Sequence, residues 1–257
     1  MSLLTDPWFY ATALPAVTLY GLSKGGFAGV SLLSLPLMSL VMAPVQAAAI
    51  LLPVLLVQDA VTVTSFRKTW DRSTLIYLMP GALAGIVLGW LTASVVPQGS
   101  VRIAVGVIAL LFCFNTWFLA PRRAAALSGG AVSPSHTWPQ AGILGTACGY
   151  ASFVVHAGSP PFLFYAVPRI ASKEALAGTM AVLFAIINLL KVPPYFGLGQ
   201  FTEANLTAAA VLLPMAVLAN VGGVWLVRRI SPVLFFRAIT ALTFVVGILL
   251  IMQGIRA

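Results

Sequence analysis

A lysine surrounded by glycines and serines marks the first place in this chain where chemistry is expected. The stretch G-L-S-K-G-G-F-A-G at positions 21–29 lies between long apolar runs. Glycine lets the backbone leave the helical path and expose N–H groups, and lysine adds positive charge, so the stretch suits an anion. Nearby serine hydroxyls can donate hydrogen bonds to the oxygens of that anion. The residues predicted to bind an anion here are Ser23, Lys24, Gly25, Gly26, Ser31 and Ser34.

The same residues also have structural interpretations. Lys24 is equally well explained as a cytoplasmic lysine, because basic residues accumulate on the inner side of membrane proteins. A single serine inside an apolar run is typical of helix packing or of a hydrogen bond to the backbone.

A second group of polar residues follows the glycine cluster G-T-A-C-G-Y at 145–150. We interpret this cluster, like the first, as a break in a membrane helix, which requires a protein or water-filled surrounding for its backbone. His156 beside it binds an anion or relays a proton, although a buried interhelical histidine fits equally well. Ser159 precedes Pro160 and Pro161 at a predicted helix start. The predicted site residues of this group are His156, Gly158 and Ser159.

An acidic residue lies deep in an apolar segment, in the sequence L-L-V-Q-D-A-V at 55–61. A carboxylate inside a membrane is costly and indicates function. Asp59 therefore either carries a proton or pairs with Lys24, and an interhelical hydrogen bond is the structural alternative. We group it with its neighbour Gln58 and with Asn188, which has the corresponding place in the second half of the chain, as a polar core.

Several chemistries have no support in the sequence. It lacks the phosphate-binding pattern G-x-x-x-x-G-K-[ST] of ATP-driven pumps. Its two histidines, His136 and His156, form no metal-ligand pattern, and its five acidic residues form no pair suited to hydrolysis. We therefore expect no enzyme activity, no cofactor and no metal. The net charge of +9 is expected from basic cytoplasmic loops, so nucleic acid is not an expected partner.

The composition predicts the kind of scaffold that holds these residues. Of 257 residues, 60% are hydrophobic and only 7% are charged, against about 25% charged in soluble domains. Apolar runs long enough to cross a bilayer recur along the chain, without the alternation of a β-barrel. The sequence therefore predicts an all-α polytopic membrane protein that contacts the lipid bilayer. The predicted segments are 8–23, 26–42, 45–66, 74–95, 101–119, 139–156, 159–170, 174–195, 203–227 and 232–254.

Two of these segments, 26–42 and 159–170, are short and interrupted by glycine or proline. They are expected to be broken or re-entrant, which gives eight to ten transmembrane helices. With the N-terminus outside, eleven basic residues fall on the inner side and three on the outer side, a bias that sets orientation. The three outer residues are Arg102, Lys191 and Arg256.

The two halves of the chain resemble each other. Corresponding positions are Leu35-Pro36 and Pro160-Pro161, Asp59 and Asn188, Pro80 and Pro214, Trp90 and Trp225, Pro97 and Pro232, and Arg102 and Arg237. Equivalent loops fall on opposite sides of the membrane, because each half has five segments. We therefore expect two inverted repeats, 1–119 and 139–257, joined by a cytoplasmic linker at 120–138. Inverted repeats are typical of secondary transporters, which bind substrate where the halves meet.

The sequence is similar to the TauE/SafE sulfite exporter family, also described as 4-toluenesulfonate uptake permeases. The similarity rests on G-L-S-K-G-G-F-A-G, the downstream Leu35-Pro36 and Pro44, and the later block Gly158-Ser159-Pro160-Pro161, and it covers about residues 10 to 254. It implies transport of small sulfur-containing or organic anions across the bacterial inner membrane. It also implies seven or eight transmembrane helices.

These observations together predict a secondary transporter that carries a small anion such as sulfite or a sulfonate by alternating access. Export is favoured because an inside-negative potential assists the exit of an anion. An anion channel and an uptake permease for organosulfonates remain alternatives, as do an intramembrane enzyme and a scaffold that carries nothing. Proton coupling through Asp59 or His156 and assembly as a homodimer are left open.

Overall fold

The computed structural model describes residues 3–24, 30–66, 69–93, 95–119, 135–170, 172–227 and 232–256, and all regular elements among them are helices. The first half contains a short 3₁₀ turn η1 (Leu3–Thr5), then α1 (Pro7–Lys24), a 3₁₀ turn η2 (Val30–Leu33), α2 (Ser34–Ser39), α3 (Pro44–Phe66), α4 (Arg72–Ala93), α5 (Gln98–Phe114) and a π-helical turn η3 (Asn115–Leu119). The second half contains α7 (Trp138–Val155), α8 (Ser159–Ala166), α9 (Lys173–Gly197), α10 (Glu203–Val227) and α11 (Pro232–Ile255). The all-helical prediction is therefore confirmed.

Four of these helices are long and apolar enough to cross a membrane within the described part of the chain. They cover Pro44–Phe66, Arg72–Ala93, Glu174–Gly197 and Glu203–Gly222. Their exposed surface is itself apolar, with Leu91, Leu189 and Leu218 among the most exposed side chains. This pattern is expected of helices that contact lipid.

The two segments predicted to be short are short in the structure. At about 1.5 Å per residue, α2 extends about 9 Å and α8 about 12 Å, against a hydrocarbon thickness of about 30 Å. Neither helix crosses a bilayer alone. The number of complete crossings stays a prediction.

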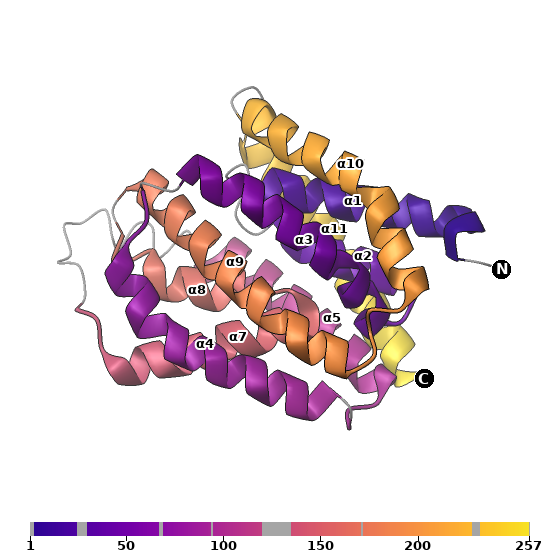
Figure 1. Cartoon of the computed structure of the whole chain (residues 1–257), viewed down its shortest axis with the longest axis horizontal. Coiled ribbons are helices and arrows are strands. Elements are labelled where there is room, and N and C mark those ends of the chain that lie inside the picture. The colour runs from indigo at the N-terminus through magenta and orange to yellow at the C-terminus, as the bar shows by residue number, and fades with distance from the viewer. Residues whose placement is uncertain are drawn as a thin grey trace.

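Helices from the two halves alternate in space (Figure 1). α3 packs against α9, and these two central helices lie between the pair formed by α1 and α10 and the pair formed by α4 and α7. α5 packs along α11. Each of these contacts joins one half of the chain to the other.

The contacts of one half correspond to those of the other. The α1–α10 contact corresponds to α7–α4, α10–α3 corresponds to α4–α9, and α1–α2 corresponds to α7–α8. α3 with α9, and α5 with α11, pair equivalent helices directly. The opposite orientation of the halves in a membrane stays a prediction.

Glycines bring α4 and α7 into close contact. A Cβ added at Gly149 would lie 2.0 Å from the carbonyl oxygen of Ala82, and one at Gly85 would lie 2.2 Å from that of Thr146. Small residues spaced by four allow membrane helices to approach this closely. The interpretation of residues 145–150 themselves as a helix break is therefore wrong, because these residues continue α7 and their glycines serve packing. The predicted break beside His156 is present, since α7 ends at Val155 and α8 begins at Ser159.

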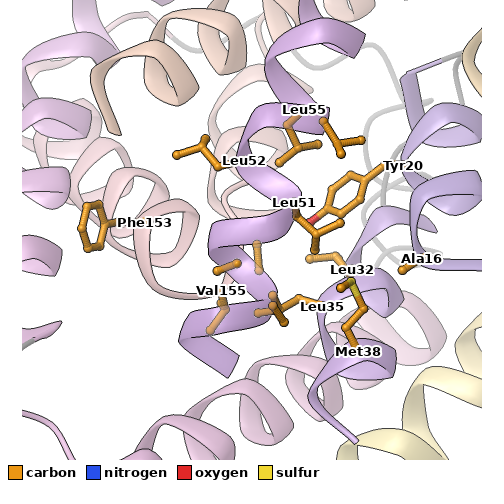
Figure 2. Packing of buried hydrophobic residues seen from close by; sticks show 14 of the residues in the cluster. Ala16, Tyr20, Leu32, Leu35, Met38, Leu51, Leu52, Leu55, Phe153 and Val155 are labelled. Carbon is orange, nitrogen blue, oxygen red and sulfur yellow. The ribbon is translucent and has the colours of Figure 1, made fainter. Parts of the chain in front are cut away.

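The apolar core around the site is built mainly on α3. Leu51, Leu52 and Leu55 are buried, and Figure 2 shows the ring of Tyr20 directed from α1 toward them. Leu35 on α2 and Val155 at the end of α7 lie at the same part of the core. The ends of α1 and α7, where the polar residues cluster, are thus fixed against one central helix.

Candidate functional site

A small cavity lies where α1, α3, α7, α8 and α9 converge. Its wall includes apolar side chains such as Leu55, Met180 and Phe184, but polar residues are more numerous in it. The polar lining residues are Tyr20, Ser23, Lys24, Ser31, Thr62, Ser152, His156, Ser159 and Asn188. The cavity therefore brings together Ser23, Lys24 and Ser31 of the first predicted group, His156 and Ser159 of the second, and Asn188.

The cavity offers about 50 Å³ to the centre of a water molecule. A single water fills roughly 10–15 Å³, so a cavity with this much room for water centres holds more than one water. An ion of similar size, with a central atom and three or four oxygens, fits this space.

Lys24 and Asp59 form an ion pair at one side of the cavity. Lys24 is the last residue of α1, and its ammonium contacts Oδ1 of Asp59 on α3. Asn188 on α9 donates from Nδ2 to Oδ2 of Asp59 at 2.6 Å. Asp59 is only 2% exposed, and both of its partners line the cavity. The pairing with Lys24, one of the two roles predicted for Asp59, is present, and a role in carrying protons stays a prediction.

Gln58 connects helices outside the cavity lining. It is buried, and its Nε2 donates to the carbonyl oxygens of Val17 at 3.4 Å and Ala216 at 3.1 Å. Asn220 on α10 donates to the carbonyl oxygen of Gln58 at 3.1 Å. These bonds tie α3 to α1 and α10, so this residue of the predicted polar core has structural contacts.

His156 ends α7 in an unusual backbone conformation. Its φ is 52°, in the left-handed region where glycine is favoured, and the N–H of Ala157 bonds back to the carbonyl oxygen of Ala151 at 3.1 Å. A side chain other than glycine at such a position stores about 1–3 kcal/mol of strain and is common at functional sites. The imidazole is held on both sides, since Nε2 is 2.9 Å from the Ala48 carbonyl oxygen and Nδ1 is 2.8 Å from Nζ of Lys191.

Lys191 is the main site residue that the sequence reasoning missed. The charge pattern assigns it to the outer side, but its side chain is fully buried, and Nζ donates to the carbonyl oxygen of Ser152 at 2.9 Å and to Oγ of Ser152 at 3.2 Å. Ser152 and Tyr20 were missed as well. A signal for Lys191 was present, because it follows Asn188 by three residues and so lies on the same side of α9.

The remaining predicted residues have varied positions. Ser23 donates to Ser31 at 3.2 Å, and both line the cavity. Ser34 is buried and is not among the lining residues. Gly158 precedes α8, where a Cβ would meet the carbonyl oxygen of Cys148 at 2.7 Å, so it serves close packing. Gly25 and Gly26 lie outside the described residues.

Side chains supply most of the hydrogen-bond donors of the cavity. α8 begins with Ser159, and because Pro160 and Pro161 have no N–H, its first turn offers fewer backbone donors than an ordinary helix start. The hydroxyl of Tyr20 has no hydrogen-bond partner among the described residues. Oγ of Ser152 accepts from Lys191, which leaves its own hydrogen free to donate into the cavity. Donors and positive charge together suit a small oxyanion.

Comparison with known proteins agrees with this chemistry. A family model described as sulfite exporter TauE/SafE matches residues 13–250, which include every residue that lines the cavity. No curated protein and no solved structure matches the chain.

Proposed function

Because the chain belongs to the TauE/SafE sulfite exporter family, whose members are membrane transporters, we propose that it carries sulfite or a related small sulfur-containing anion by alternating access. The observation that carries this proposal is the cavity shared by the two halves. Its lining includes Lys24 and at least four hydroxyl groups, and its volume suits a compact oxyanion.

The arrangement of the helices supports alternating access. The cavity lies beside the α3–α9 contact, where Asp59 of one half meets its counterpart Asn188 of the other. The correspondence between the helix contacts of the two halves supports an inverted repeat, and in such transporters substrate binds where the repeats meet. Small movements of one half against the other then open the cavity to either side.

Charge supports export and a periplasmic N-terminus. Lys24 is paired and Lys191 is buried, so neither reports on a loop. Without these two residues, ten basic residues lie on the predicted inner side and two on the outer side, which preserves the bias. An inside-negative potential favours the exit of an anion by about 2.3 kcal/mol per charge per 100 mV. Membership of the family supports a bacterial inner membrane as its location.

Counterflow in proteoliposomes tests the proposal. Vesicles loaded with unlabelled sulfite should accumulate labelled sulfite transiently and saturably, whereas a channel gives no such overshoot. Ser159→Ala should reduce this exchange because it removes a cavity donor, and Ser34→Ala should not, because Ser34 is buried away from the cavity. Absence of counterflow for sulfite and short sulfonates in either orientation would refute the proposed function.

The same vesicles test proton coupling and direction. A pH-sensitive dye inside them reports whether protons move with the anion, and imposed potentials of both signs report the preferred direction. Coupling through Asp59 or His156 predicts that Asp59→Asn or His156→Asn abolishes the dye signal more strongly than it abolishes exchange.

A further inference from the structure

Among the described residues, Lys191 has neutral hydrogen-bond partners only, in contrast to Lys24. An ammonium group has three N–H donors, and Nζ of Lys191 has three acceptors within 3.2 Å: the carbonyl oxygen and Oγ of Ser152, and Nδ1 of His156. The carbonyl oxygen of Ala48 can only accept, so Nε2 of His156 carries the ring hydrogen and Nδ1 accepts from Lys191. The contacts of Lys191 therefore suit a charged ammonium.

The charges at and directly behind the cavity do not cancel. In the described part of the chain, this region holds the positive charges of Lys24 and Lys191 and the negative charge of Asp59. Lys24 and Asp59 neutralise each other, so Lys191 leaves an excess of one positive charge. A buried charge without a counter-ion is costly, and a bound anion with one negative charge would remove this cost.

We propose that Lys191 determines the charge of the substrate, so that the cavity selects an anion with a single negative charge over a dianion of the same shape. This inference rests on the proposed function and deepens it. It identifies the substrate class as small monoanions, such as hydrogensulfite or a short sulfonate.

Lys191 acts from behind the lining and makes no contact with the ligand itself. All three of its N–H groups are used by Ser152 and His156, which are the residues that line the cavity. By donating to Oγ of Ser152, the ammonium directs the hydroxyl hydrogen of Ser152 toward the cavity. Lys191 thus positions Ser152 and also makes the electrostatic potential in the cavity more positive.

Methanesulfonate and sulfate provide a matched test, because they are nearly equal in size and shape but carry one and two negative charges. Binding is measured by calorimetry and by thermal stabilisation of the purified full-length protein, independently of transport. The wild type should bind methanesulfonate about tenfold or more tightly than sulfate. Lys191→Met, which removes the excess charge, should weaken methanesulfonate binding by about tenfold or more.

Two further variants test the excess charge without altering Lys191. Asp59→Asn raises the excess to two positive charges and should shift the preference toward sulfate. The double variant Lys24→Met/Asp59→Asn keeps the excess at one and should retain the wild-type ratio of the two affinities. These variants keep the proposal falsifiable if Lys191→Met fails to fold.

The outcomes distinguish this inference from the proposed function. Equal affinity for methanesulfonate and sulfate in the wild type, or an unchanged ratio in Asp59→Asn, would overturn the role of charge while sulfite counterflow persists. A wild type that neither binds nor exchanges sulfite would overturn the proposed function and this inference with it.

Discussion

Removal of one member of the Lys24–Asp59 pair should cost more stability than removal of both. Asp59 is 2% exposed and accepts from Lys24 and Asn188. Lys24→Met leaves a buried carboxylate with the amide of Asn188 as its remaining partner. Asp59→Asn instead leaves a lysine that lines the cavity and whose side chain is 12% exposed, so its ammonium is partly hydrated where it lies.

The structure sets the order and size of these effects. Breaking a buried ion pair at one partner costs about 3–5 kcal/mol, and we expect Lys24→Met to fall in this range. For a chain of this length, each kcal/mol lowers the Tm by about 2–4 °C, so the Tm should fall by at least about 6 °C. Asp59→Asn should cost less. In the double variant the amide oxygen introduced at position 59 can still accept from Asn188, so the double variant should lie within about 1 kcal/mol of the wild type.

Thermal unfolding in detergent, followed by tryptophan fluorescence, measures all four proteins under one condition. Thr18→Val is a suitable control, because among the described residues the Thr18 hydroxyl bonds only to the carbonyl oxygen of Leu14 in its own helix, on the exposed side. A double variant as unstable as the sum of the two single variants would show that the charges do not interact, and the assignment of the pair would fail.

Three further predictions concern helix packing, backbone strain and a buried hydroxyl group. Gly149→Ala should lower the Tm by several degrees because its Cβ would meet Ala82, whereas Gly142→Ala on the same helix meets nothing within 4 Å and should be neutral or stabilising; a similar loss in both would contradict the packing assignment. His156→Gly should be about 1 kcal/mol more stable than His156→Ala in the same unfolding assay. Both variants lose the imidazole, but glycine adopts a φ of 52° without strain and alanine does not. Ser34→Ala should stabilise the protein by about 1 kcal/mol, since the buried hydroxyl has no partner among the described residues, and a loss of stability would show that the hydroxyl has one.

The positions of the helices could be predicted from the sequence because the apolar runs are long and bounded by polar residues or proline. The convergence of Lys24, His156, Ser159 and Asn188 could also be predicted, since charged and polar groups in an apolar segment have few reasons to be there. Both inferences depend only on the cost of placing polar groups in lipid.

The sequence-based predictions failed where one residue type has two possible roles in a membrane helix. Glycines in α7 permit either a break or a close helix contact, and only the neighbouring α4 shows that Gly145 and Gly149 serve the contact. Lys191 follows an apolar run, as an interfacial lysine also does, and its burial depends on α7 packing against α9. Ser152 has no local pattern at all, because its role comes from the lysine behind it.

The interleaving of the two halves has a consequence for how the protein is made. α1 and α4 find their main partners, α10 and α7, in the half that is synthesised later. The glycine surface of α4 therefore stays in lipid while about sixty residues between Gly85 and Gly145 are added, which takes several seconds at roughly 5–20 residues per second. A ribosome that stops after α5 leaves a membrane-inserted chain with its helix-binding surfaces uncovered, so the first half is expected to be a substrate for membrane proteases until the second half arrives.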